Sequence, residues 1–155
     1  MKLDITDHKL LHELQVNGRI SNVSLAERVR FSPTACLRRV KQLESNGLIQ
    51  SYVALPDQSE VGSPENVFVL ITLKSQQEND LLNFEREVTK HPEVMECHLM
   101  FGPADYLLRV IVADSRDYER LHSENLTSVP GVDRVQSNFS LRTVVKRTEI
   151  PLGSC

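Results

Sequence analysis

Six cations gathered in one short segment are the residues with the clearest chemical potential. They are Arg19, Arg28, Arg30, Arg38, Arg39 and Lys41, with Glu27 as the one carboxylate among them. Residues 1–55 carry eight Lys or Arg against five Asp or Glu, whereas residues 56–155 carry ten against sixteen. Such clustering supplies the phosphate-neutralising charge that DNA binding needs. A solvated basic surface is the alternative that charge alone leaves open.

Metal and thiol chemistry receive little support from the sequence. Cys36, Cys97 and Cys155 are an odd number, widely spaced and without a CxxC pair, so neither a disulfide framework nor a zinc site is indicated. His8 and His12 have the i, i+4 spacing of a metal pair, but no Glu-x-x-His pattern or further ligand accompanies them. A solvated helix is therefore the preferred interpretation, and we expect no metal and no cofactor.

Enzymatic and membrane functions are also not expected. The chain contains no G-x-S-x-G, no phosphate-binding glycine loop, no H-E-x-x-H and no paired carboxylates with an obvious partner group. Its first ten residues, MKLDITDHKL, lack the apolar run of a signal peptide, and no stretch approaches the roughly 20 apolar residues that span a bilayer. With 40% apolar and 25% charged residues, we expect a folded cytoplasmic protein.

Three predicted helices position the cations. The first is expected over residues 4–17, where leucines recur at helical spacing and Asp4 or Thr6 can cap the start. The second is short and takes Asn22 as its N-cap, because apolar residues at helical spacing follow it. The third begins at Pro33, since Ser32 is a strong N-cap and proline suits the first helical position.

The third helix has the features of a DNA-reading helix. It is expected to end at Gly47, a natural C′ glycine, and to bury Cys36, Leu37, Val40 and Leu43. Its other face carries Thr34, Ala35, Arg38, Arg39, Lys41 and Gln42. A turn of about three residues, Arg30-Phe31-Ser32, joins it to the second helix, as a helix-turn-helix requires. An ordinary three-helix bundle with a solvated third helix is the alternative.

The predicted DNA contacts follow from this arrangement. The helix N-terminus and Ser32 can contact phosphate, while Thr34 and Arg38, with Arg39 or Gln42, can reach base edges in the major groove. The predicted DNA-binding set is Ser32, Pro33, Thr34, Ala35, Arg38, Arg39, Lys41 and Gln42. After the helix, residues 48–55 have strand composition and are expected to form a wing-like strand.

The second part of the chain has a different pattern, so we expect domains over residues 1–55 and 67–155 with a linker over 56–66, PDQSEVGSPEN. Strands are predicted over 67–74, 94–101, 105–113 and 132–146, with helices over 78–91 and from a cap at about Ser115 to before Pro130. This order is β-α-β-β-α-β, a ferredoxin-like α+β fold with both helices on one sheet face. The other face would be apolar and exposed, so we expect at least a homodimer rather than a monomer.

The sequence resembles the Lrp/AsnC (leucine-responsive, feast/famine) family of transcriptional regulators. The resemblance lies in D-x-x-D-x-K-L-L-x-x-L-Q-x-N-G-R-I-S at 4–21, L-A-E-R-V at 25–29, S-P-T-A-C-L-R-R-V-K-Q-L-E-x-x-G-L-I at 32–49, E-C-H-L-M-F-G-P-A-D-Y-L-L-R-V at 96–110 and L-x-x-V-P-G-V at 126–132. It covers nearly the whole chain. It implies a winged helix-turn-helix followed by a ferredoxin-like effector domain, dimers that assemble into octamers, and amino acids as effectors.

The resemblance also implies where an effector binds. In this family the pocket lies between dimers, around the turn that matches Met100, Phe101, Gly102, Pro103, Ala104 and Asp105 of this chain. Turn backbone groups and the Asp105 carboxylate suit an α-amino and α-carboxylate group. Pro103 and Ala104 depart from the family's polar and larger residues, and Pro103 lacks a backbone donor. Gly102 and Asp105 as turn residues only, and an architectural DNA-binding protein without an effector, are the alternatives.

Overall fold

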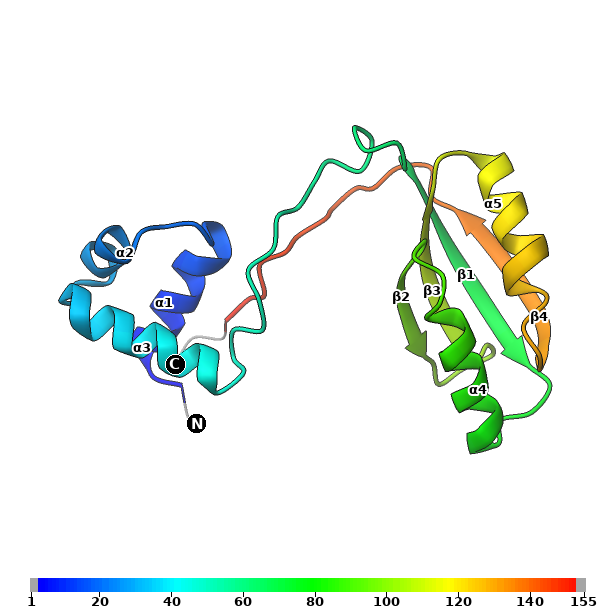
Figure 1. Ribbon diagram of the computed structural model, residues 1–155, viewed down its shortest axis with the longest axis horizontal. Coiled ribbons are helices and arrows are strands. Elements are labelled where there is room, and N and C mark those ends of the chain that lie inside the picture. The colour runs from blue at the N-terminus through cyan, green and yellow to red at the C-terminus, as the bar shows by residue number, and fades with distance from the viewer. Residues whose placement is uncertain (1–2, 153–155) are drawn as a thin grey trace. The chain divides into compact units, whose positions relative to one another are not determined.

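The computed structural model describes residues 3–152, which divide into two compact units (Figure 1). The second unit is Pro56–Thr143, and the first combines the residues before it with those after it. This differs from the predicted domain 67–155, because the end of the chain returns to the first unit. The Ile150 N–H donates to Gln15 Oε1 at 2.6 Å, Gln15 Nε2 donates to the Ile150 carbonyl at 3.2 Å, and Leu152 packs against the helical core.

The first unit contains α1 (Ile5–Val16), α2 (Asn22–Val29) and α3 (Pro33–Ser45). Each helix begins at a side chain that accepts backbone N–H groups of the first turn, namely Asp4, Ser21 and Ser32. The prediction of Asn22 as the second N-cap is wrong. Ser21 takes that position, because the Asn22 side chain is used elsewhere, as a donor to the Pro33 carbonyl at 2.7 Å.

The core of the first unit is made of Leu10, Leu11, Leu25, Ala26, Val29, Cys36, Val40 and Leu43. Leu37, predicted to be buried, is 44% exposed, because 100° per residue turns it away from the stripe centred on Cys36 and Leu43. Gly47 has φ 71°, as a C′ glycine requires. The wing-like strand predicted over 48–55 is not formed. In the described part of the chain no segment pairs with these residues, and a strand needs a paired neighbour.

The second unit is a four-stranded antiparallel sheet with two helices. Its elements are β1 (Glu65–Leu73), α4 (Glu78–Val88), β2 (Val94–Leu99), β3 (Tyr106–Val112), α5 (Ser115–Leu121) and β4 (Val132–Phe139). A π-helical turn, His122–Leu126, continues α5. The strand order β2-β3-β1-β4, antiparallel throughout, confirms the predicted ferredoxin-like fold. Figure 1 shows α4 and α5 against the sheet.

Alternate residues of the two central strands form the core of this unit. The fully buried set includes Val67, Val69 and Ile71 of β1 and Leu108, Val110 and Val112 of β3, packed with Phe84 of α4 and Tyr118 of α5. Two predicted details are wrong: β4 ends at Phe139 rather than continuing to residue 146, and Asp114 rather than Ser115 caps α5. Among the described residues no helix has the length and apolarity to cross a membrane.

Candidate DNA interface and effector turn

The outward face of α3 carries three of the predicted DNA-binding side chains. Thr34, Arg38 and Lys41 are exposed and follow one another at spacings of four and three residues, which places them on one face of the helix. Ser45 continues this face, although the sequence analysis did not include it, and its Oγ donates to the Gln42 carbonyl at 3.1 Å. The helical spacing of positions 34, 38, 41 and 45 is the sequence signal that could have identified Ser45. We call Thr34, Arg38, Lys41 and Ser45 the outer face.

The start of α3 is built to approach an anion. Ser32 Oγ accepts the Ala35 N–H at 3.3 Å, Pro33 occupies the first position, and the helix dipole points its positive end here. Ser32 and Pro33 are exposed, whereas Ala35 is half-buried. Asn22 donates its side-chain amide to the Pro33 carbonyl, so the first turn of α2 is tied to the first turn of α3. Asn22 was predicted only as the cap of the second helix, and this contact with α3 carries no local sequence signal.

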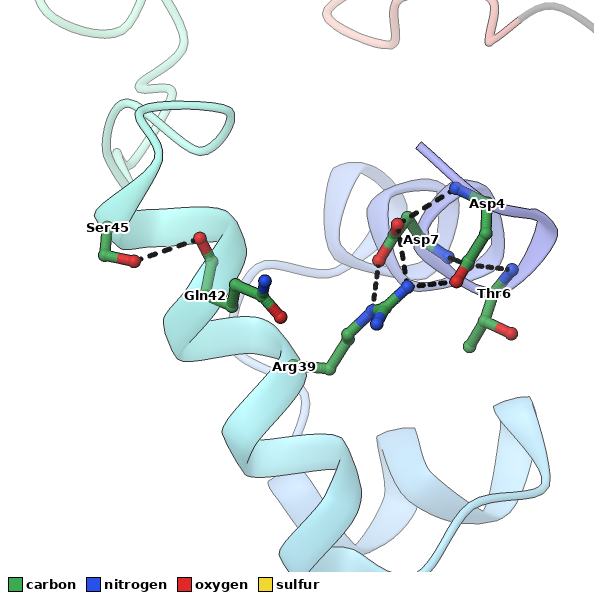
Figure 2. Close-up of polar contacts among 6 residues, drawn as sticks. All are labelled: Asp4, Thr6, Asp7, Arg39, Gln42 and Ser45. Carbon is green, nitrogen blue, oxygen red and sulfur yellow. Dashed lines mark hydrogen bonds and ion pairs between the residues drawn. The ribbon is translucent and has the colours of Figure 1, made fainter. Parts of the chain in front are cut away.

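Arg39 does not lie on the outer face. Figure 2 shows its guanidinium directed at the start of α1, where Nε donates to Asp7 Oδ1 at 2.6 Å and Nη2 to Asp7 Oδ2 at 3.0 Å. The same Nη2 donates to Asp4 Oδ2. The Asp7 side chain is fully buried, and Asp7 also accepts the Asp4 N–H at 3.0 Å, which completes a capping box. The structure therefore separates Arg39 from Arg38, its neighbour in the sequence.

These contacts shift the titration of the groups involved. The Asp7 N–H, and then the Arg39 charge, lower the pKa of Asp4 below its ordinary value. The hydrogen bonds to Asp7 raise the pKa of Arg39. Arg39 is therefore a permanently charged group that faces two carboxylates, and its charge is already matched within the first unit.

The remaining candidate ligands and thiols do not assemble a site. Arg28 Nη1 pairs with Glu13 Oε2 at 2.7 Å, beside a surface hollow that His12 also lines. Within residues 3–152 no three His, Cys, Asp or Glu side chains come together as metal ligands. Burial raises the pKa of the Cys36 thiol, and burial with the Glu85 charge raises that of Cys97 to about 11, so both are less ionised at neutral pH than a free cysteine. Cys155 lies outside the described residues.

The turn between β2 and β3 divides the six predicted effector residues in two. Met100, Phe101, Gly102 and Pro103 are exposed, whereas Ala104 and Asp105 are buried. The turn is closed by backbone hydrogen bonds, because the Met100 N–H donates to the Asp105 carbonyl and the Asp105 N–H to the Ile71 carbonyl, each at 2.8 Å. The apolar side chains of Met100, Phe101 and Pro103 therefore border this turn without being packed into the core.

The Asp105 carboxylate also holds the end of β1. Its Oδ2 accepts the Leu73 N–H at 2.6 Å and its Oδ1 accepts the Gln76 side-chain amide at 2.7 Å. Both donors are neutral, and the ion pairs of the described residues do not include Asp105. Gln76 was missed by the sequence analysis, because its link to Asp105 spans 29 positions and carries no local spacing signal.

Comparisons with known proteins match both units. Residues 66–150 match the Lrp/AsnC ligand binding domain, and residues 3–50 match a winged helix-turn-helix DNA-binding domain. The chain is 45% identical over 142 residues to the leucine-responsive regulatory protein of Escherichia coli K12, covering 92% of this chain and 87% of the relative. It is 40% identical over 151 residues to the Bkd operon transcriptional regulator of Pseudomonas aeruginosa, covering 97% and 99%.

Solved structures of transcriptional regulators have the same fold as this chain. A transcriptional regulator from Neisseria meningitidis in complex with L-methionine superposes with a TM-score of 0.92 at 37% identity, covering 97% of each chain. A feast or famine regulatory protein from M. tuberculosis, also complexed with L-methionine, gives 0.87 at 32% identity, covering 96% of this chain and 99% of the other. With its helix-turn-helix and its ferredoxin-like ligand-binding domain, this chain belongs to the Lrp/AsnC family of transcriptional regulators.

Proposed function

We propose that this regulator reads DNA with the outer face of α3 and that an apolar L-amino acid bound at the 100–105 turn changes its DNA binding. The observation that carries the first part is the exposure of Thr34, Arg38 and Lys41 on one face, directly after the capped N-terminus at Ser32. A helix with this face fits the major groove, and its positive N-terminal end favours phosphate.

The outer face gives each residue a different task. Arg38 has the length and the paired donors to bind a guanine edge, and Thr34, one turn nearer the N-terminus, presents a hydroxyl and a methyl group. Lys41 is a point charge suited to phosphate, and Ser32 reaches phosphate at the helix start. Pro33, Ala35 and Gln42 border these contacts. Arg39 is excluded from direct contact by this proposal, since Asp7 and Asp4 already bind it.

The effector class follows from the groups around the turn. Each Asp105 oxygen accepts one hydrogen bond from the chain, so lone pairs remain for a ligand ammonium group. The exposed apolar side chains of Met100 and Phe101 suit an apolar ligand side chain. Pro103 has no N–H, so the ligand carboxylate is held by other turn amides. Structurally similar proteins bound to L-methionine support this class of ligand.

A homodimer, with further assembly up to an octamer, is part of the proposal. The sheet face away from α4 and α5 carries Phe68 and Leu70 of β1 beside Leu107 and Ile111 of β3. Phe68 is 39% exposed in the single chain. Covering these side chains with the same face of a second copy removes apolar surface from water, and the two-fold axis supplies two recognition helices for successive half-sites.

The test begins with duplexes that the protein selects from a random-sequence pool. Binding to a selected duplex and to an unselected one is measured at several salt concentrations, with and without L-methionine or L-leucine. The proposal expects a selected sequence that binds more tightly and an affinity that the amino acid changes. Equal, salt-sensitive binding to both duplexes with no ligand effect would instead establish an architectural protein.

A further inference from the structure

Polar contacts join the recognition helix α3 to the other two helices of the first unit at two separate points. Near its start, the Asn22 amide donates to the Pro33 carbonyl at 2.7 Å. In its middle, the Arg39 guanidinium grips Asp7 with two donors and reaches Asp4 with one of them (Figure 2). The second point joins α3 to the capping box that begins α1.

The Arg39 contact defines the rotation of α3 about its own axis. Apolar packing is non-directional, so the stripe of Cys36, Val40 and Leu43 allows some rotation of the helix. A guanidinium bound side-on to a carboxylate has a fixed planar geometry and allows much less. Arg38 lies 100° from Arg39 around the helix, so an Arg39 fixed on α1 fixes the direction of the outer face.

Charge distinguishes this role from a direct DNA contact. Arg39 faces two carboxylates, one of them fully buried, so the group of Asp4, Asp7 and Arg39 carries no positive charge to offer a phosphate. We infer that Arg39, with Asp7, is a positioning residue that sets the orientation of the recognition helix for sequence-specific DNA binding. The inference rests on the proposed role of the outer face.

The experiment compares two neighbouring arginines under the same charge change. Affinity for the selected duplex is measured for Arg39→Gln, for Asp7→Asn and for the double variant that carries both changes. The matched controls are Arg38→Gln and the double variant that combines Arg38→Gln with Asp7→Asn. We expect Arg39→Gln and Asp7→Asn each to lower specific affinity by about threefold to thirtyfold. The double variant should recover most of the loss, because two amides can hydrogen-bond where the ion pair stood.

A direct contact between Arg39 and DNA would give different results. If Arg39 bound DNA itself, Asp7→Asn would raise affinity by removing a negative charge, and the double variant would bind as weakly as Arg39→Gln. Either result overturns the inference. Loss of affinity in Arg38→Gln that Asp7→Asn does not repair supports the proposed function. An unaffected Arg38→Gln would contradict that function independently of the result at Arg39.

Arg39→Lys provides the second variant in case Arg39→Gln does not fold. Lysine keeps the charge but offers no planar pair of donors, so we expect a lower ratio of selected to unselected affinity with an unchanged salt dependence. In Arg39→Gln, which removes the charge, a slope of log affinity against log salt that is less steep by about one would instead reveal a lost phosphate contact. Wild-type preference for the selected duplex in Arg39→Lys would also overturn the inference.

Discussion

Asp7 in the first unit and Asp105 in the second are the buried charged side chains of the described residues, at 0% and 6% exposure. They differ in what faces them. Asp7 meets the guanidinium of Arg39, whereas Asp105 meets the Leu73 N–H and the Gln76 amide, which are neutral. A buried carboxylate matched by a cation is complete within the fold. One held only by neutral donors keeps its attraction for a cation, as the proposed ligand ammonium requires.

Asp7 is therefore a structural carboxylate and Asp105 a candidate binding one, although Asp7 contacts the predicted DNA-binding residue Arg39 and Asp105 was itself predicted to bind the effector. Asp7 holds α1 to the recognition helix, so its loss is expected to act on folding and on DNA binding together. Asp105 joins the end of β1 to a turn whose residues 100–103 are exposed. Its hydrogen bonds hold β1, whereas its charge is proposed to bind the ligand ammonium group. Variants that change one property and keep the other test this distinction.

Arg39→Ala is expected to have the largest effect, on the stability of the first unit. It leaves the fully buried Asp7 carboxylate without its cation, and an unpaired buried charge is strongly destabilising. The chain has no Trp, so amide hydrogen exchange is the suitable measurement, with loss of protection in α1 and α3. Amides of β1 serve as the internal control, and equal loss there would contradict a local role.

Asp105→Asn is expected to have a smaller effect on stability, by about 1 to 3 kcal/mol, because either the buried Leu73 N–H or the Gln76 amide loses its acceptor. Its effect on ligand response should be complete, since the charge that binds the ammonium is gone. DNA affinity without ligand should stay near wild type. A wild-type response to L-methionine in this variant, measured on the selected duplex, would make Asp105 a turn residue only.

The sequence predicted the elements and their order, because periodicity, caps and turn residues are local signals. Ser32-Pro33 and Gly47 marked the bounds of α3 closely. It could not predict the partners of the two buried aspartates. Arg39 and Asp7 are 32 positions apart, and the Asp105 partners Leu73 and Gln76 are 32 and 29 apart. The strand prediction for residues 48–55 is wrong for a related reason, since strand composition does not show whether a pairing strand exists.

Arg38→Ala tests an exposed arginine of α3 against the paired Arg39. Its side chain is exposed and its loss leaves no buried charge, so hydrogen-exchange protection in α1 should stay at wild type. Binding to the selected duplex should weaken by about 1 to 3 kcal/mol, and preference at one base position should relax. Binding measured against single-base variants of the duplex tests this. Unchanged affinity and preference would remove Arg38 from the outer face's reading residues.

The smallest expected effect is on the acid stability of the first unit. The pKa of Asp4 is lower in the folded chain than its ordinary value of 3.8, so its contribution is present above that value and is lost as pH falls through the folded pKa. Asp4→Asn keeps a good N-cap but removes this titration. Protection in α1, followed by hydrogen exchange between about pH 5 and pH 3, should therefore fall less steeply in Asp4→Asn than in wild type. Protection in β1 should be the same in wild type and in Asp4→Asn. If protection in α1 depended equally on pH in the two proteins, the contact of Arg39 with α1 would be stabilised by Asp7 alone.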